Sequence, residues 1–263
     1  MRVQWTSSKR PADDELFKHW GTSLLRLGTG FVCSVNGPEK NLPCPCAECG
    51  GEKITNHWTF LIRTANHVVY NEEEAKATKV DFFFNIDSNE SDGTMKTEFG
   101  LELDWSSPGR DICRMVCVTH DEALAQRIES AWRSWRRGKV NLQDLSHPEL
   151  LPLPTCGGDR EPALIISHPH GRSKKISIGY VTGKEEPVIK YNTATCPGSS
   201  GAPVFVSDHN LKKFRSLRFI VPVHCGSYEE TTPENADHGD LRKDEEHRDK
   251  THQLNFGYHR HIT

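Results

Sequence analysis

The stretch 195–205 reads Thr-Cys-Pro-Gly-Ser-Ser-Gly-Ala-Pro-Val-Phe and runs into an apolar strand. Glycines on both sides of its two serines let the backbone turn tightly and approach a bound carbonyl group. The amides of Gly198 and Ser200 can then point at one oxygen atom, which is how an oxyanion hole is built. Ser199 is the other serine of the turn, but the register relative to Gly201 and the proline that follows favours Ser200. Glycine-serine turns are also common as purely structural features, so the stretch needs support from elsewhere in the chain.

Two upstream segments give that support. The apolar run 58–62 is followed by Arg-Thr-Ala-Asn and then His67, so a histidine lies at the end of an expected strand. Asp111 opens an alternating apolar strand that continues to Val118. Asp104, which also lies near a turn, is the alternative acidic residue. We favour Asp111 because the apolar strand starts directly after it.

The order His67, Asp111, Ser200 is that of chymotrypsin and differs from the orders of subtilisin and the α/β-hydrolases. With the surrounding motifs, it resembles the trypsin/chymotrypsin-fold serine peptidases over most of the chain, from about Gly28 to Tyr258. The resemblance implies an all-β fold with two antiparallel six-stranded β-barrels, a connecting helix and a site in the cleft between the barrels. It also implies a serine endopeptidase that forms an acyl-enzyme on protein or peptide substrates and needs no cofactor for catalysis.

In that resemblance each residue has a role. Ser200 is the nucleophile, His67 takes and returns its proton, and Asp111 holds the imidazole tautomer. Gly198 and Ser200 supply the oxyanion hole. Ser199 stands where secreted digestive members carry an aspartate that pairs with a new N-terminus, so activation by N-terminal trimming is not expected.

Two residues address substrate choice. Thr195 lies five residues before Ser200, and His224 lies on the strand expected to line the primary pocket. This pair resembles that of bacterial glutamyl endopeptidases and picornavirus-type main proteases, which select glutamate or glutamine before the cut. A hydroxyl and an imidazole N–H can donate to a side-chain oxygen, and buried donors reject substrates that lack one. Two alternatives remain open: His224 as a satisfied strand histidine, and a preference for large apolar residues.

Composition limits the other classes of function. The 263 residues suffice for two barrels with a sizeable core, and 33 basic against 36 acidic residues give a net charge of −3. No basic block indicates a nucleic-acid surface, and no apolar run has the length of a membrane span. The first ten residues lack the apolar core of a signal peptide, and the nine cysteines are an odd number. We therefore expect an intracellular protein, cytoplasmic or nuclear, and the sequence leaves its oligomeric state open.

Three cysteines form a separate cluster, Cys44, Cys46 and Cys49, spaced C-x-C-x-x-C. Reduced thiolates this close suit a tetrahedral structural zinc site, which needs a fourth ligand. His57 is the first candidate for that ligand, and Cys33 is the alternative. A surface loop with free thiols would explain the same spacing without a metal.

The expected organisation is an N-terminal arm (1–20), a first barrel with the connecting helix (21–150) and a second barrel that carries the nucleophile (151–263). A helix is expected over 121–136, where apolar residues recur at helical spacing after an aspartate cap. The turn His168-Pro-His-Gly is expected in the second barrel, and a long charged loop over 228–251. The expected strands are 24–35, 58–63, 80–86, 111–118, 163–167, 176–182, 188–191, 202–207, 217–224 and 254–258. Two readings of another class remain: a catalytically silent protease-like binding module, and a zinc-dependent interaction domain.

Overall fold

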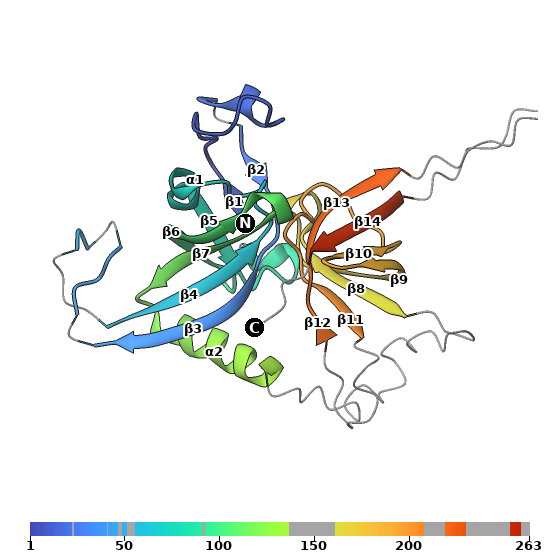
Figure 1. Cartoon of the computed structure of the whole chain (residues 1–263). Helices are drawn as coiled ribbons and strands as arrows, with labels where there is room; N and C mark the ends of the chain where they lie inside the picture. Colours follow the sequence, from blue (N-terminus) through green and yellow to red (C-terminus); the bar gives the residue numbers. More distant parts are fainter. Residues whose placement is uncertain are drawn as a thin grey trace, which may run out of the picture.

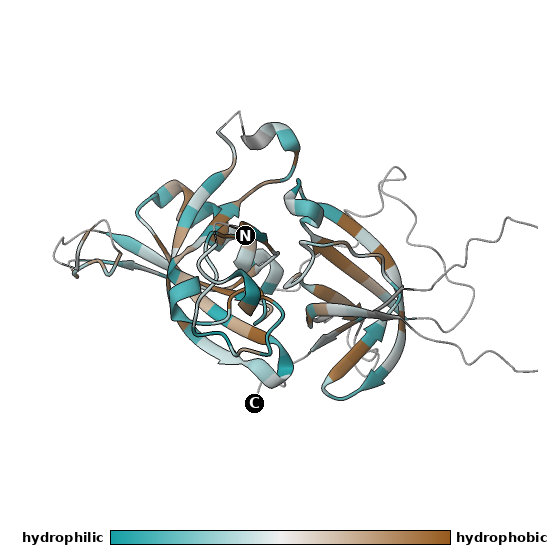
Figure 2. Cartoon of the chain, turned by 90° about the horizontal axis from the view of Figure 1, so that it is seen from above, coloured by the Kyte–Doolittle hydropathy of each residue, from teal (hydrophilic) through white to brown (hydrophobic). Residues whose placement is uncertain are grey.

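A computed structural model describes residues 1–22, 24–40, 42–46, 49–51, 56–90, 93–136, 161–207, 219–229 and 253–258. Their strands form two antiparallel sheets of seven strands each. Each sheet is curved, and the two lie beside one another as two halves of the molecule (Figures 1 and 2).

The first sheet has the order β2-β1-β5-β6-β7-β4-β3. Its strands are β1 (Arg2–Val3), β2 (Arg26–Leu27), β3 (Phe31–Glu39), β4 (His57–Thr64), β5 (Thr78–Phe82), β6 (Lys96–Ser107) and β7 (Ile112–Thr119). Side chains of β4 alternate between buried and half-buried over most of the strand, as expected for a strand with one face on a core. β7 is buried along nearly its whole length, and it pairs with β4 on one side and with β6 on the other.

The second sheet has the order β12-β11-β8-β9-β10-β14-β13. Its strands are β8 (Pro162–Ser167), β9 (Lys175–Glu185), β10 (Val188–Tyr191), β11 (Val204–Ser207), β12 (Phe219–Ile220), β13 (Val223–Glu229) and β14 (Gln253–Tyr258). A small core of apolar residues from β8, β10 and β11, with Ala202 just before β11, fills this half. The turn 197–201, here called the nucleophile turn because it carries the predicted nucleophile Ser200, leads directly into β11.

Helices are few. They are α1 (Glu72–Lys76), α2 (Glu122–Arg136) and the short 3-10 turns η1 (Phe17–His19), η2 (Asp87–Glu90), η3 (Pro108–Arg110) and η5 (Pro169–Gly171). In α2, Asp121 Oδ1 accepts the Leu124 N–H at 2.9 Å, which is an N-cap bond. Leu124 and Ile128 of α2 are buried, and the Trp132 indole donates to the Cys33 carbonyl at 3.0 Å. None of the described helices has the length and apolar character that a membrane span would need.

The predicted all-β class with two antiparallel halves and a connecting helix is confirmed. The strand count differs, because each sheet has seven strands rather than six. In the first sheet β1 comes from the segment expected to be an arm, and its Arg2 pairs with both Leu27 and Lys79. The sequence reading also missed β6, whose Gly, Glu and Asp residues obscure its alternation. The expected boundary at 150/151 and most of the expected loop 228–251 lie outside the described residues.

Candidate active site

His67 and Asp111 lie side by side in the structure. His67 follows β4 in a turn, and Asp111 lies between η3 and β7 with φ 48° and ψ 42°. Aspartate visits this left-handed region more readily than most residues with a side chain. Pairing of Thr64 with Cys113 brings the end of β4 to the start of β7. Asp111 then meets His67 twice: Oδ1 accepts the backbone N–H at 2.8 Å, and Oδ2 lies 2.7 Å from Nδ1.

These two contacts determine which nitrogen of the His67 ring carries the proton. An ionised carboxylate can only accept, so Nδ1 of His67 carries the proton and Nε2 of the neutral ring is an acceptor. That tautomer is the one a general base needs. Asp104 instead forms an ion pair with Arg114 of β7. The structure thus brings Asp111, and not Asp104, to the histidine.

The two serines of the nucleophile turn differ in their surroundings. Ser199 is fully buried, and its Oγ donates to Ser167 Oγ at 3.1 Å. Ser200 is half-buried. Among the described residues no hydrogen bond joins its hydroxyl to His67; such catalytic bonds often tighten only once substrate is bound. Ser200 is the serine of this turn that a substrate could reach.

The amide of Gly198 is held in one orientation by the carbonyls on either side of it. The Pro197 carbonyl accepts the His170 N–H at 2.6 Å, and the Gly198 carbonyl accepts the Thr29 hydroxyl at 2.8 Å. In a planar trans peptide the carbonyl and the following N–H point in opposite directions, so the Gly198 N–H points away from His170. Within the described part of the chain, neither this N–H nor that of Ser200 donates a hydrogen bond. Both are therefore available to an external oxygen.

Thr29 joins this turn to the first sheet. Its N–H donates to the Ser200 carbonyl at 2.8 Å, and its own carbonyl accepts the Thr64 hydroxyl at 2.7 Å. Its hydroxyl oxygen accepts the His168 N–H at 3.0 Å while donating to Gly198. One buried side chain thus links the histidine-bearing half to the oxyanion turn.

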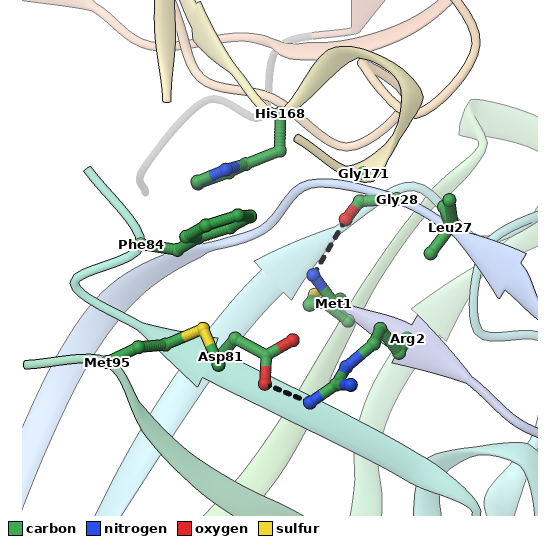
Figure 3. A pocket seen from close by; sticks show the side chains of 9 residues that line it. All are labelled: Met1, Arg2, Leu27, Gly28, Asp81, Phe84, Met95, His168 and Gly171. Atoms are coloured by element: carbon green, nitrogen blue, oxygen red, sulfur yellow. Dashed lines mark hydrogen bonds and ion pairs between the residues drawn. The ribbon is translucent and has the colours of Figure 1, made fainter. Parts of the chain in front are cut away.

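The predicted turn 168–171 is anchored on the first half of the molecule. The ring of His168 stacks on that of Phe84, with centroids 5.9 Å apart and planes 5° from parallel (Figure 3). Gly171 packs against the side chain of Leu27 from the opposite half. The turn 168–171, whose His170 N–H donates to the Pro197 carbonyl, is therefore held in place by Phe84 and by Leu27.

The two residues predicted to choose the substrate are each connected to a partner that the sequence reading missed. The Tyr191 hydroxyl lies 2.7 Å from His224 Nδ1, in a buried contact. The Thr195 hydroxyl donates to Asn255 Oδ1 at 2.8 Å, and Asn255 Nδ2 donates to the Thr193 carbonyl at 2.7 Å. Tyr191 and Asn255 face each other in the pairing of β10 with β14. The side chains of Tyr191, His224, Thr195 and Asn255 therefore lie close together.

Burial keeps both members of the first pair uncharged. Burial lowers the pKa of His224 to about 4; the charge of His67 lowers it too, and Asp111 opposes this. Burial also raises the pKa of Tyr191 well above its ordinary value of 10.0. At neutral pH the contact is therefore a hydrogen bond between a neutral phenol and a neutral imidazole.

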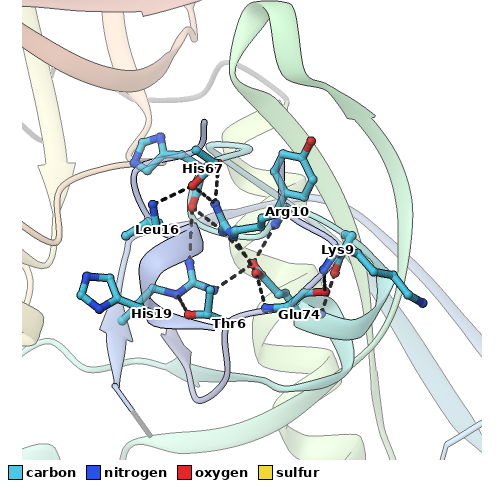
Figure 4. A network of polar contacts seen from close by, with 12 residues as sticks. Thr6, Lys9, Arg10, Leu16, His19, His67 and Glu74 are labelled. Atoms are coloured by element: carbon cyan, nitrogen blue, oxygen red, sulfur yellow. Dashed lines mark hydrogen bonds and ion pairs between the residues drawn. The ribbon is translucent and has the colours of Figure 1, made fainter. Parts of the chain in front are cut away.

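A buried ionic network lies behind the histidine (Figure 4). Glu74 of α1 is fully buried and pairs with Arg10 at 2.7 Å and with Arg26 at 2.8 Å. Arg10 also donates to the His67 carbonyl at 2.8 Å, and Arg26 to the Val68 carbonyl at 2.9 Å. The segment expected to be an N-terminal arm thus contributes a side chain that holds the backbone of the histidine turn.

The three predicted sulfur ligands come together, but with a different histidine. Sγ of Cys44, Cys46 and Cys49 and Nε2 of His120 all lie within 4.8 Å of one another. His57, the predicted fourth ligand, lies beside this group, with its ring centroid 6.3 Å from that of His120. Trp58 pairs with Thr119, so His57 and His120 lie at the same end of the β4–β7 pair. His57 is buried, whereas His120 is exposed and its Nε2 lies among the sulfurs.

Thr29, Tyr191, Asn255 and His120 are the site residues that sequence reasoning missed. Thr29 had a signal, since it lies in the Gly-Thr-Gly-Phe segment that resembles a strand of the peptidase family. Tyr191 ends β10, Asn255 lies within β14 and His120 follows β7. No local pattern marks these three residues, because their contacts depend on which strands pair.

Two solved structures resemble this chain at low sequence identity. The chain resembles a solved structure of Deg5, with 17% identity, 64% of this chain and 73% of that chain covered, and a TM-score of 0.33. It also resembles the thermostable serine protease AL20 from an extremophilic microorganism, with 11% identity, 76% and 78% covered, and a TM-score of 0.41. No curated protein matches the chain by sequence.

The assignment rests on the family model, which is that of the trypsin-like peptidase domain. It matches residues 28–211, a range that contains Thr29, His67, Asp111 and Ser200. The fold described above agrees with it, with two antiparallel sheets and few helices. The chain belongs to the trypsin-like peptidase domain family and has the fold of the trypsin/chymotrypsin serine peptidases.

Proposed function

We propose that this peptidase is a serine endopeptidase with Ser200 as nucleophile, His67 as general base and Asp111 as the residue that orients the base. The observation that carries the proposal is the pair of hydrogen bonds that the Asp111 carboxylate accepts from the backbone N–H and the ring Nδ1–H of His67. They leave Nε2 as an acceptor next to a turn whose serine is accessible. Hydrolysis by a trypsin-like peptidase needs no catalytic cofactor.

The proposed reaction has two halves. His67 Nε2 takes the proton of the Ser200 hydroxyl as Oγ attacks the substrate carbonyl carbon. The oxygen of the tetrahedral intermediate is stabilised by the N–H groups of Gly198 and Ser200. The C–N bond then breaks, and the proton passes from His67 to the leaving amine. In the second half His67 takes a proton from water as the water attacks the acyl carbon; the C–Oγ bond then breaks, the acid product leaves, and His67 returns the proton to Ser200 Oγ.

Within the predicted preference for glutamate or glutamine, we favour glutamine. Asn255 Nδ2 donates to the Thr193 carbonyl, so its Oδ1 faces Thr195 and takes the proton of the Thr195 hydroxyl. The Thr195 oxygen is left as an acceptor. If Tyr191 donates to His224 Nδ1, then the Nε2–H of His224 is a donor. One donor and one acceptor match a carboxamide, whereas a glutamate would bury a charge beside an uncharged imidazole.

The chain is also proposed to work inside the cell. No disulfide joins any of the eight cysteines that fall in the described ranges, which suits a reducing compartment. Recovery of the native protein in a soluble cytosolic or nuclear fraction would be the expected result.

One experiment tests the proposed activity. Purified protein is incubated with a randomised peptide library, beside Ser200→Ala, Asp111→Asn and Asp104→Asn, and with a fluorophosphonate probe that labels activated serines. We expect cleavage and labelling by the wild type, loss of both in Ser200→Ala, and a fall in kcat of about 10⁴ for Asp111→Asn. Asp104→Asn is the matched control and should stay close to the wild type. A wild-type chain that neither cleaves nor reacts would instead favour the silent binding module.

A further inference from the structure

Three cysteine sulfurs surround one nitrogen of His120. Nε2 lies 3.3 Å from Sγ of Cys44, 3.4 Å from Sγ of Cys46 and 3.5 Å from Sγ of Cys49. The cysteines lie between β3 and β4, and the histidine lies between β7 and α2. Two segments that are some 70 residues apart along the chain (separations of 71 to 76) thus meet at a single point.

Hydrogen bonds alone do not account for this arrangement. His120 Nδ1 lies 3.3 Å from the Asn56 carbonyl oxygen, which can only accept, so Nδ1 carries the proton. Nε2 of the neutral ring then offers one lone pair, and three thiol groups cannot all donate to it. A single cation between the four atoms would satisfy all of them at once.

The distances fit a tetrahedral zinc ion. With Zn–S bonds of about 2.3 Å and a Zn–N bond of about 2.0 Å, tetrahedral geometry separates sulfur from nitrogen by about 3.5 Å. The three measured separations, 3.3 to 3.5 Å, lie close to this value. The bond from Nδ1 to a backbone carbonyl is the contact that commonly fixes the tautomer and direction of a metal-binding histidine.

We propose that Cys44, Cys46, Cys49 and His120 bind a structural Zn²⁺ ion. Four protein ligands close the coordination sphere, which is the pattern of structural rather than catalytic zinc sites. The ion would tie the β3–β4 loop to the junction of β7 and α2. The site lies at the end of β4 opposite to His67, and the eight residues of β4 span about 25 Å, so the ion would act on the loop and on stability (Figure 1).

The test begins with the untagged wild-type chain, purified from zinc-supplemented cells without chelator. We expect close to one zinc per chain by plasma mass spectrometry. X-ray absorption at the zinc edge should give three sulfur neighbours at about 2.3 Å and one nitrogen at about 2.0 Å. The proposal would be overturned by a zinc content below about a tenth of an equivalent per chain, even after Zn²⁺ has been added back at about 100 times the protein concentration.

Variants then identify the ligands. Cys46→Ser and His120→Ala should lose the metal, and His120→Cys should keep it with four sulfur neighbours. His57→Gln and Cys33→Ser are the matched controls, because both residues carry ligand atoms and were the fourth ligands expected from the sequence; both variants should keep one zinc. His57 lies beside the site, with its ring centroid 6.3 Å from that of His120, whereas Cys33 lies opposite the middle of β4. Metal kept in His120→Ala but lost in His57→Gln would contradict the assigned fourth ligand.

A third measurement uses only the wild-type chain, so its result does not depend on whether the variants fold. Removing the metal from the wild type with a strong chelator under reducing conditions should lower Tm, and Zn²⁺ should restore it, whereas Mg²⁺ should not. A disulfide among the three cysteines in the freshly isolated protein, found by mass spectrometry without metal, would also overturn the site.

Discussion

At the scale of single residues, Thr29 connects the first half of the molecule to the turn that we propose to hold the oxyanion. It is almost fully buried, and its hydroxyl both accepts from His168 and donates to Gly198. A side chain of the same shape without the hydroxyl would leave a buried carbonyl and a buried N–H without their partner. The Gly198 amide would then lose part of its fixed orientation.

Thr29→Val is therefore expected to lower kcat by about 10- to 100-fold with little change in KM, because an oxyanion donor acts mainly on the transition state. Thr29→Ser keeps the hydroxyl and should recover most of kcat. Steady-state kinetics on one cleaved peptide checks this. An equal effect of both substitutions, or an effect on KM alone, would show that Thr29 serves packing only.

His224 gives a second prediction at this scale, on pH. Its pKa of about 4 lies below the ordinary 6.5, so the imidazole stays neutral from about pH 5.5 to 8. A protonated imidazole would favour a substrate with glutamate before the cut. Because His224 stays neutral, the kcat/KM of a Gln peptide divided by that of the matched Glu peptide should not change over this range. Tyr191→Phe should reduce the ratio, since it removes the hydrogen bond to Nδ1. A ratio that shifts toward Glu with a midpoint near 6.5 would show that His224 titrates normally.

At the scale of elements, α1 and the N-terminal segment act as one support for the histidine turn. Burial alone would raise the pKa of Glu74, but the hydrogen bond from Arg10 and the charge of Arg26 outweigh it and lower that pKa. An acid with a lowered pKa contributes stability above its unfolded pKa of 4.5 and loses it as pH falls through the folded pKa. The network should therefore weaken in acid.

We expect Glu74→Gln to lower the free energy of unfolding at pH 7 by about 3–5 kcal/mol, because two buried arginines lose their counter-charge. Glu73→Gln, on the same helix but half-buried, is the control and should have little effect. Urea unfolding at pH 7 and at about pH 4 checks both. The gap between Glu74→Gln and the wild type should narrow at the lower pH; a gap that widens there would contradict the sign of the shift.

At the scale of the whole molecule, the two halves meet at Gly201. Its φ is 86°, a region that favours glycine, and a Cβ there would collide with the Thr29 carbonyl and the Thr64 hydroxyl of the first half. Its N–H donates to the His224 carbonyl at 2.8 Å in the second half. One glycine thus allows the nucleophile turn to approach the histidine turn.

Gly201→Ala should abolish most of the activity and lower Tm by about 5 °C or more, from steric overlap and backbone strain together. Gly109→Ala is a suitable control, because a Cβ at Gly109 meets nothing within 4 Å. Differential scanning calorimetry with the same peptide assay distinguishes the two. Full activity in Gly201→Ala would mean that the close contact of the two halves at Gly201 is not needed for activity.

From the sequence alone it was possible to predict the fold class, the order of the triad candidates, the capped helix over 121–136 and the cluster of three cysteines. These features are local, because hydrophobic periodicity, turn glycines and ligand spacing are all read within a few residues of one another. Strand pairing in the folded chain brings Asp111, already favoured over Asp104, to His67, brings His120 rather than His57 to the sulfurs, and joins Tyr191 to His224. Each of these depends on which strands pair and in which register, and pairing is set by the burial of whole sheet faces rather than by any short segment. The role of Thr29 is of the same kind, since its partners lie 139 and 169 residues away along the chain.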